Sequence, residues 1–413
     1  MSSSTTTVRI ENKLKNEAVA ILDAIGLTLT SSITMFLKAV VREKGLPLQL
    51  KLEDSGSLSA PKNNLRLNQA FLLKKDEFFT LYEDVEKELQ HYSTVMRGKA
   101  VFCNCDDPFE SAFFKYFLIN FDRLGLKSLT STCYSSSSLS GREYPVTDNC
   151  AYKAVVTRLP ENALMRPDGS LDLESVFKLE GNKLERLLGD GDFRSKECVD
   201  ILVGSDLIVT NPPFSLFREF IGLLEKYKKK YIVLGNMNAA TCKELFPLFG
   251  DNKLWYGKSI RSGDRKFFVP DDYPLKAANC GVDCNGRRFI RVKGVRWFTN
   301  VESGEYVPPL NLNSTYDPLT YPKYDNYDAI EVGKTSNIPR DFEGVMGVPI
   351  TFLDKYCPEQ FEIIMLANGN ARTNVSPDVL ARVRYKAHPE DRGGVGVVAG
   401  ERKYARILIK RKK

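Results

Sequence analysis

Short apolar, β-branched runs alternate with amphipathic stretches along the middle of this chain. Buried strands are expected at 100–103, 128–133, 206–210 and 231–235, each with the composition of a strand covered on both faces. Amphipathic stretches expected to form helices lie at 111–121 and directly after Phe214. Alternating strands and helices predict an α/β fold built on a parallel, doubly wound sheet with right-handed crossovers.

A different pattern occupies the first fifty residues. Val8 and Ile10 alternate with polar residues, as on a half-buried strand. Two amphipathic helices are expected after them, the first ending at Gly26 and the second near Gly45. One strand and two helices make a core that is too small to fold alone, so this pattern predicts that two copies pair.

Composition divides the chain into four parts. A polar linker at 53–73 separates a small domain at 1–52 from a core at 74–240. The remaining residues, 241–413, contain short strands, aromatic loops and turns. Inside the core, the serine-rich and irregular stretch 135–180 is interpreted as a surface insertion. The 413 residues, 43% of them hydrophobic, provide enough material for two or three domains.

The composition also limits the cellular setting. No run is long and apolar enough to span a membrane, and the amino terminus lacks the pattern of a signal peptide. Nine cysteines are too few for a disulfide scaffold in a chain of this length, which favours a cytoplasmic protein with reduced thiols. The near pairs Cys103/Cys105 and Cys280/Cys284 have no histidine at a zinc-site spacing, so we predict no metal.

Most of the net charge lies at one end. The last thirteen residues hold seven Lys or Arg against one Glu, whereas the whole chain carries +7. A basic tail is typical of a protein with a polyanionic partner, although it can also serve solubility alone.

The tetrapeptide Asn-Pro-Pro-Phe at 211–214 follows the strand 206–210 directly, at the edge of the sheet where open α/β folds bind ligands. These residues suit one reaction, the methylation of the exocyclic amine of adenine or cytosine. The amine is a weak nucleophile because its lone pair is delocalised into the ring. The Asn211 side-chain oxygen and the Pro212 carbonyl can accept both amine hydrogens and so favour the tetrahedral nitrogen of the transition state.

The other two residues of the tetrapeptide suit the same chemistry. Pro213, with Pro212, fixes the direction of the backbone carbonyls, and Phe214 offers a ring on which a base swung out of the duplex can stack. The alternative is a proline-stiffened structural loop with a core phenylalanine.

A second polar loop, Cys-Asn-Cys-Asp-Asp-Pro at 103–108, follows the strand 100–103, where an S-adenosylmethionine-binding fold places its cofactor loop. Asp107, followed by Pro108, has the pattern of a helix start. Asn104 and Asp106 are therefore the candidates for the polar groups of the cofactor.

A third loop, Gly-Asp-Gly-Asp-Phe-Arg-Ser at 189–195, ends in an acid and an aromatic residue. Asp192 could hydrogen-bond the adenine of a cofactor and Phe193 could pack on it. An ordinary acidic turn is the alternative.

Six strings resemble the EcoRI-type adenine-specific DNA methyltransferases, and the resemblance extends from residue 74 to the carboxyl terminus. They are KKDEFFT at 74–80, CNCDDP at 103–108, GDGDFRS at 189–195, VTNPPFSLFR at 209–218, YPKYDNYDAI at 321–330 and GVMGVPITF at 344–352. The resemblance implies a Rossmann-like methyltransferase sheet, S-adenosylmethionine as cofactor, adenine in double-stranded DNA as target, and a target-recognition region in 241–413.

The resemblance also assigns roles to residues. It places Phe79 and Thr80 near the methionine part of the cofactor, Asn104, Cys105 and Asp106 in its first loop, Asp192 and Phe193 at its adenine, and Asn211, Pro212, Pro213 and Phe214 at the target base. The chain lacks the glycine-rich first loop of the wider class, as the nearer family does. The chain differs from the nearer family in its amino-terminal domain, 1–52, and in the glycine-rich stretch 392–400. These differences leave its recognition sequence open.

The amino-terminal domain resembles the ribbon-helix-helix domain of RelB/DinJ antitoxins, through GLTLT at 26–30 and VVREKGLP at 40–47. The resemblance implies a homodimer through 1–52 whose paired strands enter the major groove, with Thr5, Thr7 and Arg9 facing the bases. A domain that dimerises without touching DNA is the alternative. A toxin or a restriction nuclease is a candidate partner.

Three functions are consistent with the sequence. The favoured one is methyl transfer from S-adenosylmethionine to the adenine amine at a DNA site, with base flipping and a link to restriction-modification. The second is an antitoxin-like DNA-binding regulator whose methyltransferase fold is inactive. The third is methylation of RNA or of a protein glutamine. The intact residues 211–214 and the DNA-binding-like amino-terminal domain favour the first.

Overall fold

The structure is a computed structural model that describes residues 78–134, 151–161, 164–165, 171–269, 273, 275, 280–304 and 308–412. The chain divides into two compact units, Met1–Lys62 and Asn63–Lys413, and all described residues belong to the second. The predicted ribbon-helix-helix domain, with Thr5, Thr7 and Arg9, and the predicted linker lie outside the described residues.

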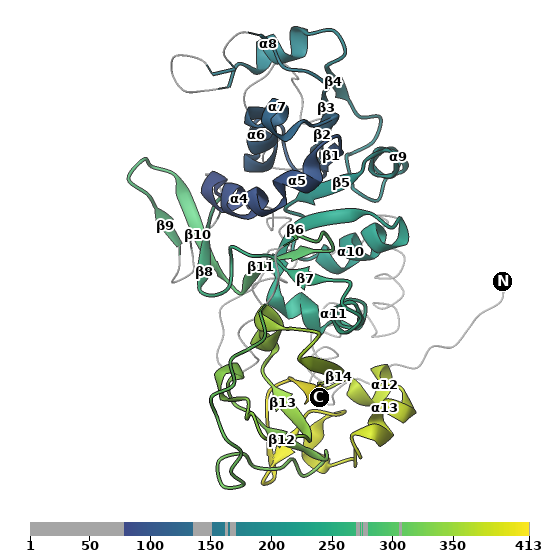
Figure 1. The fold of residues 1–413 in the computed structure, drawn as a ribbon. Helices are drawn as coiled ribbons and strands as arrows, with labels where there is room; N and C mark the ends of the chain where they lie inside the picture. The colour runs from purple at the N-terminus through teal and green to yellow at the C-terminus, as the bar shows by residue number, and fades with distance from the viewer. Residues whose placement is uncertain are drawn as a thin grey trace, which may run out of the picture. The chain divides into compact units, whose positions relative to one another are not determined.

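A mixed eight-stranded sheet forms the centre of this unit, in the order β4-β3-β2-β1-β5-β6-β11-β7 (Figure 1). Its four middle strands run parallel and agree with the four predicted ones: β2 (Ser128–Thr132), β1 (Ala100–Cys103), β5 (Leu207–Thr210) and β6 (Lys230–Asn236). Every residue of β1 and β5 is buried, as expected for parallel strands covered on both faces. The α/β methyltransferase-like fold class is therefore confirmed.

The outer strands correct the prediction of a wholly parallel sheet. β3 (Tyr152–Val156) and β4 (Lys183–Arg186) extend one edge in antiparallel order, and β11 (Val295–Thr299) and β7 (Trp255–Tyr256) extend the other. β3 lies inside the predicted surface insertion, yet its alternate residues are buried in the core. β11 and β7 follow residue 240, so the sheet continues beyond the predicted end of the catalytic core.

Helices cover both faces of the sheet. On one face α4 (Tyr82–Leu89) and α6 (Ala112–Ile119) pack against alternate residues of β1 and β5, and on the other face α9 (Lys196–Gly204) and α10 (Phe217–Lys226) do so. Short segments complete this part: α5 (Ser93–Met96), α7 (Phe121–Leu124) and α8 (Leu173–Lys178). No helix in the described ranges is long and apolar enough to cross a membrane.

The helix predicted at 111–121 is present as α6, but the helix start predicted at Asp107 is not. Ser111 caps α6 by accepting from the backbone N–H groups of Phe113 and Phe114. Asp107 instead accepts from the N–H of Phe109 at 2.8 Å and forms a turn before the helix. Asp107 is thus structural, as predicted, but does not begin the helix.

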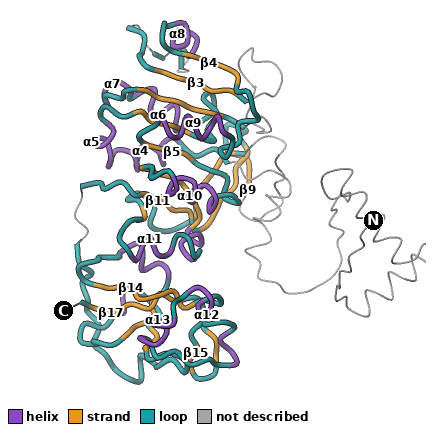
Figure 2. Tube along the Cα trace, turned by 90° about the vertical axis from the view of Figure 1, so that its right-hand side faces the viewer, coloured by secondary structure: helices purple, strands orange, loops and turns teal. Residues whose placement is uncertain are grey.

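Two smaller sheets follow. An antiparallel sheet has the order β8-β10-β9, with β8 (Asp264–Phe268), β10 (Arg288–Lys293) and β9 (Cys280–Val282). A four-stranded sheet has the order β12-β13-β17-β14, with β12 (Ala329–Glu331), β13 (Val345–Val348), β17 (Arg406–Arg411) and β14 (Phe361–Ala367). Figure 2 shows the four-stranded sheet at the end of the unit opposite α8.

A buried ion pair joins the central sheet to this last region. The Arg296 guanidinium on β11 donates to the carboxylate of Asp354 at 2.7 Å, and both side chains are less than a tenth exposed. Asp354 lies on a 3₁₀ helix, Ile350–Lys355.

Candidate active site

The loops that follow β1 and β5 are held together by hydrogen bonds between them. β1 and β5 are parallel neighbours, so their carboxyl ends meet at one edge of the sheet. The hydroxyl of Thr210, the last residue of β5, donates to the carbonyl of Asn104 and to the carboxylate of Asp106. The predicted cofactor loop and the tetrapeptide 211–214 therefore form one site.

Asp106 is the centre of this connection. Its carboxylate also accepts from the Ser111 hydroxyl at 2.8 Å and from the Asn211 backbone N–H at 3.4 Å. Burial raises the pKa of Asp106 to about 7, although the hydrogen bonds from Thr210, Ser111 and Asn211 act in the opposite direction. Because its oxygens are engaged inside the protein, Asp106 orders the two loops rather than offering an open carboxylate.

The Asn211 side chain is oriented by one end only. Its amide nitrogen donates to the backbone carbonyl of Phe78 at 2.8 Å. Its oxygen is buried and accepts no hydrogen bond from any described residue. The amide thus presents a fixed acceptor without a donor, which is the group that the sequence predicted for the amine of a target base.

Two further site residues have buried polar atoms without a partner. Asn104 is fully buried, and its side-chain oxygen accepts from the Thr132 hydroxyl at 3.1 Å, which leaves its amide nitrogen as a free donor. The hydroxyl oxygen of Thr80 is also buried without a partner in the described structure. An unsatisfied buried polar group costs about 1–3 kcal/mol, so such groups at one edge of a sheet indicate a ligand.

Phe214 is more enclosed than the sequence suggested. Its side chain is 9% exposed and packs edge-on against Phe78, with ring centres 5.9 Å apart, and against Phe267 of β8 at 6.3 Å. Pro212 is buried and Pro213 is half-buried. A base that stacks on Phe214 must therefore displace part of this aromatic cluster.

The loop 103–108, which the sequence predicted to bind the cofactor, turns without glycine. Cys105 adopts a backbone φ of +70°, in the left-handed region where side chains other than glycine, asparagine and aspartate are rare. Burial raises the pKa of the neighbouring Cys103 thiol, and its side chain belongs to the core. The loop therefore makes its sharp turn with Cys105 in a conformation that glycine usually adopts.

The loop 189–195 reaches the same edge of the sheet. At Gly191, which has a φ of +80°, an added Cβ would lie 2.1 Å from the carbonyl oxygen of Cys133, directly after β2. Only glycine allows the loop to pack this closely. Asp192 and Phe193 thus lie on a loop that packs against the end of a strand neighbouring β1.

The side chains of this third loop are already satisfied. The Asp192 carboxylate accepts from the backbone N–H of Arg194 at 2.8 Å and from its guanidinium at 2.6 Å, and these bonds lower the pKa of Asp192. The Phe193 ring is 3% exposed and packs edge-on against Phe220. Neither residue offers a free group, and their contacts with a cofactor stay a prediction.

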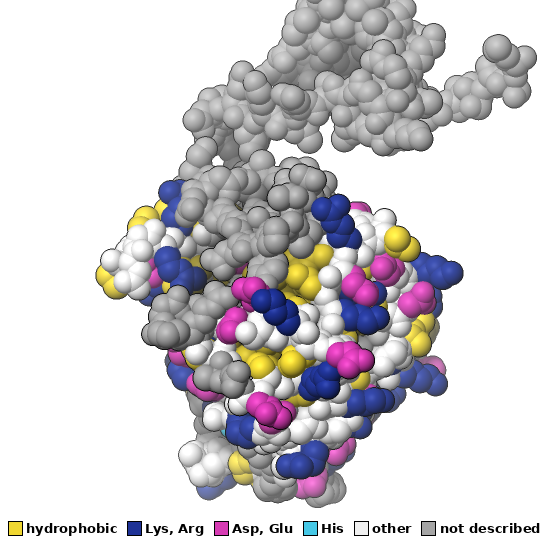
Figure 3. All heavy atoms as spheres, turned by 90° about the horizontal axis from the view of Figure 1, so that it is seen from above, with side chains coloured by type: hydrophobic (Ala, Val, Ile, Leu, Met, Phe, Trp, Pro, Cys, Tyr) yellow, Lys and Arg dark blue, Asp and Glu magenta, His cyan; other side chains and the backbone are white. Residues whose placement is uncertain are grey.

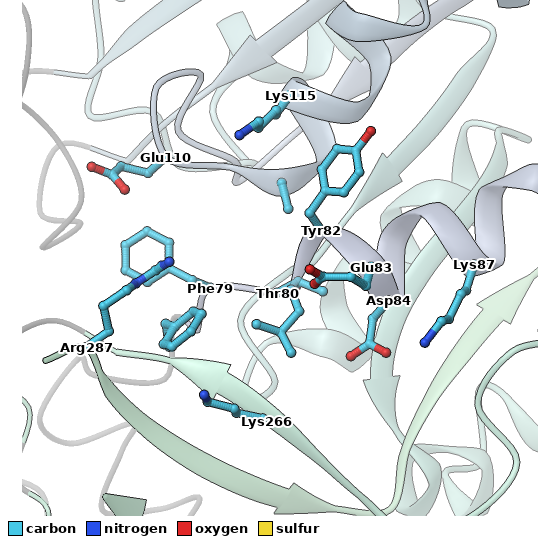
Figure 4. Close-up of a pocket in the computed structure, with 13 residues that line it drawn as sticks. Phe79, Thr80, Tyr82, Glu83, Asp84, Lys87, Glu110, Lys115, Lys266 and Arg287 are labelled. Atoms are coloured by element: carbon cyan, nitrogen blue, oxygen red, sulfur yellow. The ribbon is translucent and has the colours of Figure 1, made fainter. Parts of the chain in front are cut away.

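Phe79 and Thr80 line a cavity of about 630 Å³ (Figure 4). Its other walls come from α4, from the start of α6, from β8 and from Arg287. The backbone of Phe79 exchanges two hydrogen bonds with Phe268 of β8, at 3.0 and 3.1 Å. This bridge ties the segment that orients Asn211 to the three-stranded sheet.

Sequence reasoning missed Phe78 as a functional residue. Its carbonyl orients Asn211 and its ring contacts Phe214. The string KKDEFFT at 74–80 contained it, but nothing in that string distinguished Phe78 from Phe79. Among the described residues, no group of three or more His, Cys, Asp or Glu side chains could hold a metal ion.

Comparisons with known proteins identify the family. Residues 66–412 match the family described as adenine-specific methyltransferase EcoRI, and residues 3–69 match the RelB antitoxin family. The chain is 41% identical over 359 residues to the type II methyltransferase M.EcoRI of Escherichia coli, covering 85% of this chain and 97% of that protein.

A second relative is the type II methyltransferase M.MpnI of Mycoplasma pneumoniae, 36% identical over 352 residues, with 84% of this chain and 98% of that protein covered. No solved structure matches the chain. The RelB match covers the amino-terminal domain that the sequence identified as antitoxin-like. Because one family matches most of the chain, including all three loops of the site, the protein belongs to the EcoRI-type adenine-specific methyltransferases and methylates adenine in DNA.

Proposed function

We propose that the methyl donor is S-adenosylmethionine and that the acceptor is the exocyclic amine of an adenine flipped out of double-stranded DNA. The cofactor supplies an electrophilic methyl group. The observation that carries the proposal is the buried Asn211 oxygen, which has a fixed direction and accepts no hydrogen bond from the described residues.

In this mechanism Asn211 and Pro212 act on the amine nitrogen. Their oxygens accept its two hydrogens, which draws the nitrogen lone pair out of the ring and toward the methyl group. The proton becomes acidic once nitrogen carries the methyl group, so no strong base is required. Pro213 keeps the loop rigid, and Phe214 stacks on the base after the aromatic cluster adjusts.

The unpaired polar groups of Asn104 and Thr80 fit a polar cofactor. The Asn104 amide nitrogen can donate to it, and the Thr80 hydroxyl can donate or accept. We therefore assign Phe79, Thr80, Asn104, Cys105 and Asp106 to the cofactor region, with Asp106 as the residue that orders the loop. Asp192 and Phe193 complete the proposed region beside the adenine of the cofactor.

We further propose that residues 1–52 form a homodimer that contacts DNA through Thr5, Thr7 and Arg9. The RelB antitoxin match supports this assignment. A cytoplasmic location, where host DNA is accessible, and a restriction nuclease or toxin as a partner would suit such a protein. Light scattering of the full chain should give the mass of a dimer, and Arg9→Ala should keep that mass while weakening DNA binding.

The test of the proposed activity uses the purified full chain, S-adenosylmethionine labelled in its methyl group, and plasmid DNA without adenine methylation. We expect label in DNA, and nucleoside analysis should recover it as N6-methyladenine. Parallel reactions with RNA and with whole-protein extract serve as controls. Label in RNA or in glutamine, with none in DNA, would overturn the assignment.

A further inference from the structure

The two faces of the sheet β8-β10-β9 differ in character. On the inner face, Phe267 of β8 is buried, and Ile290 and Val292 of β10 pack against the core of the central sheet. Side chains alternate between the faces along a strand, so the outer face carries the residues between them. On β8 these are Asp264, Lys266 and Phe268, and on β10 they are Phe289, Arg291 and Lys293.

Cations and aromatic rings interleave on this outer face. The Arg287 guanidinium lies 3.6 Å from the ring centre of Phe268. The Lys266 ammonium lies between two rings, 4.7 Å from Phe268 and 4.5 Å from Phe289. Such stacking holds a cation in place by the ring quadrupole while its N–H groups stay accessible to another partner.

The positive charge on this face is only partly balanced. Lys266 and Arg291 face each other across neighbouring strands, an arrangement in which like charges repel. Asp283 forms an ion pair with Lys266, and Asp264 forms one with Arg291, each at 3.5 Å. The exposed Arg287 forms no ion pair with a described residue. A polyanion would relieve this repulsion.

The cationic face is connected to the catalytic tetrapeptide. Lys266, Phe268 and Arg287 form one wall of the cavity that Phe79 and Thr80 also line (Figure 4). Phe268 pairs with Phe79, whose neighbour Phe78 orients Asn211. An anion bound here would therefore be connected to Asn211 through Phe268 and the segment Phe78–Phe79.

The remaining charges of the cavity limit where such an anion can lie. Glu83 and Asp84 of α4, together with Glu110, line the same cavity and would repel an anion that enters it, so we expect the phosphate contacts at the exposed Arg287 and Arg291. Seen from the α8 end of the unit, basic and acidic side chains are interspersed without a region of one sign (Figure 3). The cation and aromatic stack on β8 and β10 thus differs from that surface.

We propose that the outer face of β8 and β10, with Lys266, Arg287 and Arg291 held by Phe268 and Phe289, binds the phosphate backbone of the substrate DNA beside the target adenine. This inference rests on the proposed function, because it needs a DNA substrate at Asn211. Arginine forks match phosphate oxygens, and phosphate contacts position a duplex without reading its sequence. The hydrogen bonds between Phe79 and Phe268 then connect the strand that binds DNA with the segment that orients Asn211.

The experiment measures binding of the full chain to short duplex DNA at a series of salt concentrations. Each lost phosphate contact should reduce the slope of log K against log salt by about 0.9. We expect that reduction for Arg287→Gln and for Arg291→Gln, and a larger one for the double variant. The Michaelis constant for DNA should rise in both variants, whereas kcat at saturating DNA and cofactor should fall much less.

A matched control removes a cation of similar setting elsewhere. Lys226 at the end of α10 is exposed and lies 5.3 Å from the ring centre of Tyr227. The helix after β5 runs back across the sheet, so its end lies away from the carboxyl edge of the strands. Lys226→Gln should leave the salt slope unchanged, and Arg287→Lys should restore most of the slope lost in Arg287→Gln.

The outcomes separate the two proposals. Slopes that are equal for the wild type, Arg287→Gln and Arg291→Gln would overturn the phosphate-binding face, while adenine methylation by the wild type would leave the proposed function intact. A wild type that binds duplex DNA but does not methylate adenine would instead overturn the proposed function.

Discussion

Two loops at the same edge of the sheet differ in whether their polar side chains have hydrogen-bond partners. In the loop after β5, the Asn211 oxygen is buried and lacks a donor among the described residues. In the loop 189–195, the Asp192 carboxylate is paired with Arg194 and the Phe193 ring is packed on Phe220. One loop is stabilised by its own contacts, whereas the other retains a polar group that only a further partner can satisfy.

This difference separates positions that await a ligand from positions that merely lie near one. A folded chain tolerates few buried polar atoms without a partner, because each destabilises the fold by about 1–3 kcal/mol. Eight side-chain atoms of this kind occur in the described residues, and three belong to residues that the sequence assigned to the site. We therefore place more weight on Asn211, Asn104 and Thr80 than on Asp192 and Phe193.

The largest expected effect is that of Asn211→Ala. Removing one preorganised acceptor of the transition state typically lowers kcat by about 100-fold or more. Asn211→Ala also removes the hydrogen bond to the Phe78 carbonyl, so the free energy of unfolding should fall by about 1 kcal/mol, which is a small part of the stability of a typical domain. Methyl transfer at saturating DNA and cofactor measures this effect, and near-normal turnover would contradict the assignment.

Asn326→Ala is the matched control. Asn326 is also buried, but its amide donates to the Val395 carbonyl and its oxygen accepts from the Val397 N–H. We expect this variant to lose stability in denaturant unfolding while the folded fraction keeps its turnover. The account would be contradicted if Asn326→Ala lowered turnover while Asn211→Ala lowered only stability.

Phe214→Ala should weaken DNA binding by a smaller factor, since a base stacked on an aromatic ring is worth about 1–3 kcal/mol. It should also reduce stability, because Phe214 packs against Phe78 and Phe267. DNA with a mismatch at the target adenine is already partly unstacked and should recover some activity. Loss of stability without rescue by the mismatch would assign Phe214 to packing alone.

Asp106→Asn should change the pH dependence of stability more than turnover. Burial raises the folded-state pKa of Asp106 to about 7, well above that of an unfolded aspartate, so between about pH 4 and pH 7 the folded state holds a proton that the unfolded state releases. The stability that this proton provides is complete below about pH 4 and is lost as the pH rises to about 7.

The amide of the variant can donate to Ser111 and still accept from Thr210, so the loops should stay connected. Unfolding in denaturant across this pH range should show that the wild type loses stability relative to Asp106→Asn as the pH rises. Parallel pH profiles would indicate that Asp106 is ionised in the folded protein throughout.

The smallest effect is expected for Asp192→Asn. Its ion pair with Arg194 is partly exposed, and such pairs contribute about 0–1 kcal/mol. We expect Asp192→Asn to weaken binding of S-adenosylmethionine by a few-fold at most, and less than Asn104→Ala does. Calorimetric titration of both variants gives the order, and a reversed order would show that Asp192 binds the cofactor despite its pairing.

The parts of the fold that could be predicted are those whose pattern is local. β1 and β5 are short, continuous apolar runs, and the tetrapeptide follows one of them directly. β3 was missed because only alternate residues are buried and the strand follows a long irregular stretch. The left-handed turn at Cys105 was missed because the residue there is not glycine.

The details of the site depend on contacts between distant segments. Phe78 orients Asn211, and Thr210 contacts Asp106, across more than a hundred residues of the chain, so no spacing in the sequence reports these contacts. For the same reason, the sequence could not show that Phe78 orients Asn211. Arg194 is only two residues from Asp192, but whether the two side chains pair depends on the conformation of the loop. The sequence identifies the chemistry of these residues, whereas their satisfied or unsatisfied state follows from the fold.

The most direct test of the central claim compares two bases at the target position, in the wild type and in Asn211→Ala. Once methylation mapping has identified the recognition sequence, DNA binding is measured for a duplex with adenine and for one with purine, which lacks the amine. Easier flipping of purine affects both proteins equally and cancels in the cycle. Because a hydrogen bond contributes about 0.5–1.5 kcal/mol, we predict that the wild type prefers adenine more strongly than Asn211→Ala does, by a factor of about 2–12. An equal preference in both proteins would show that the unpaired Asn211 oxygen does not bind the adenine amine.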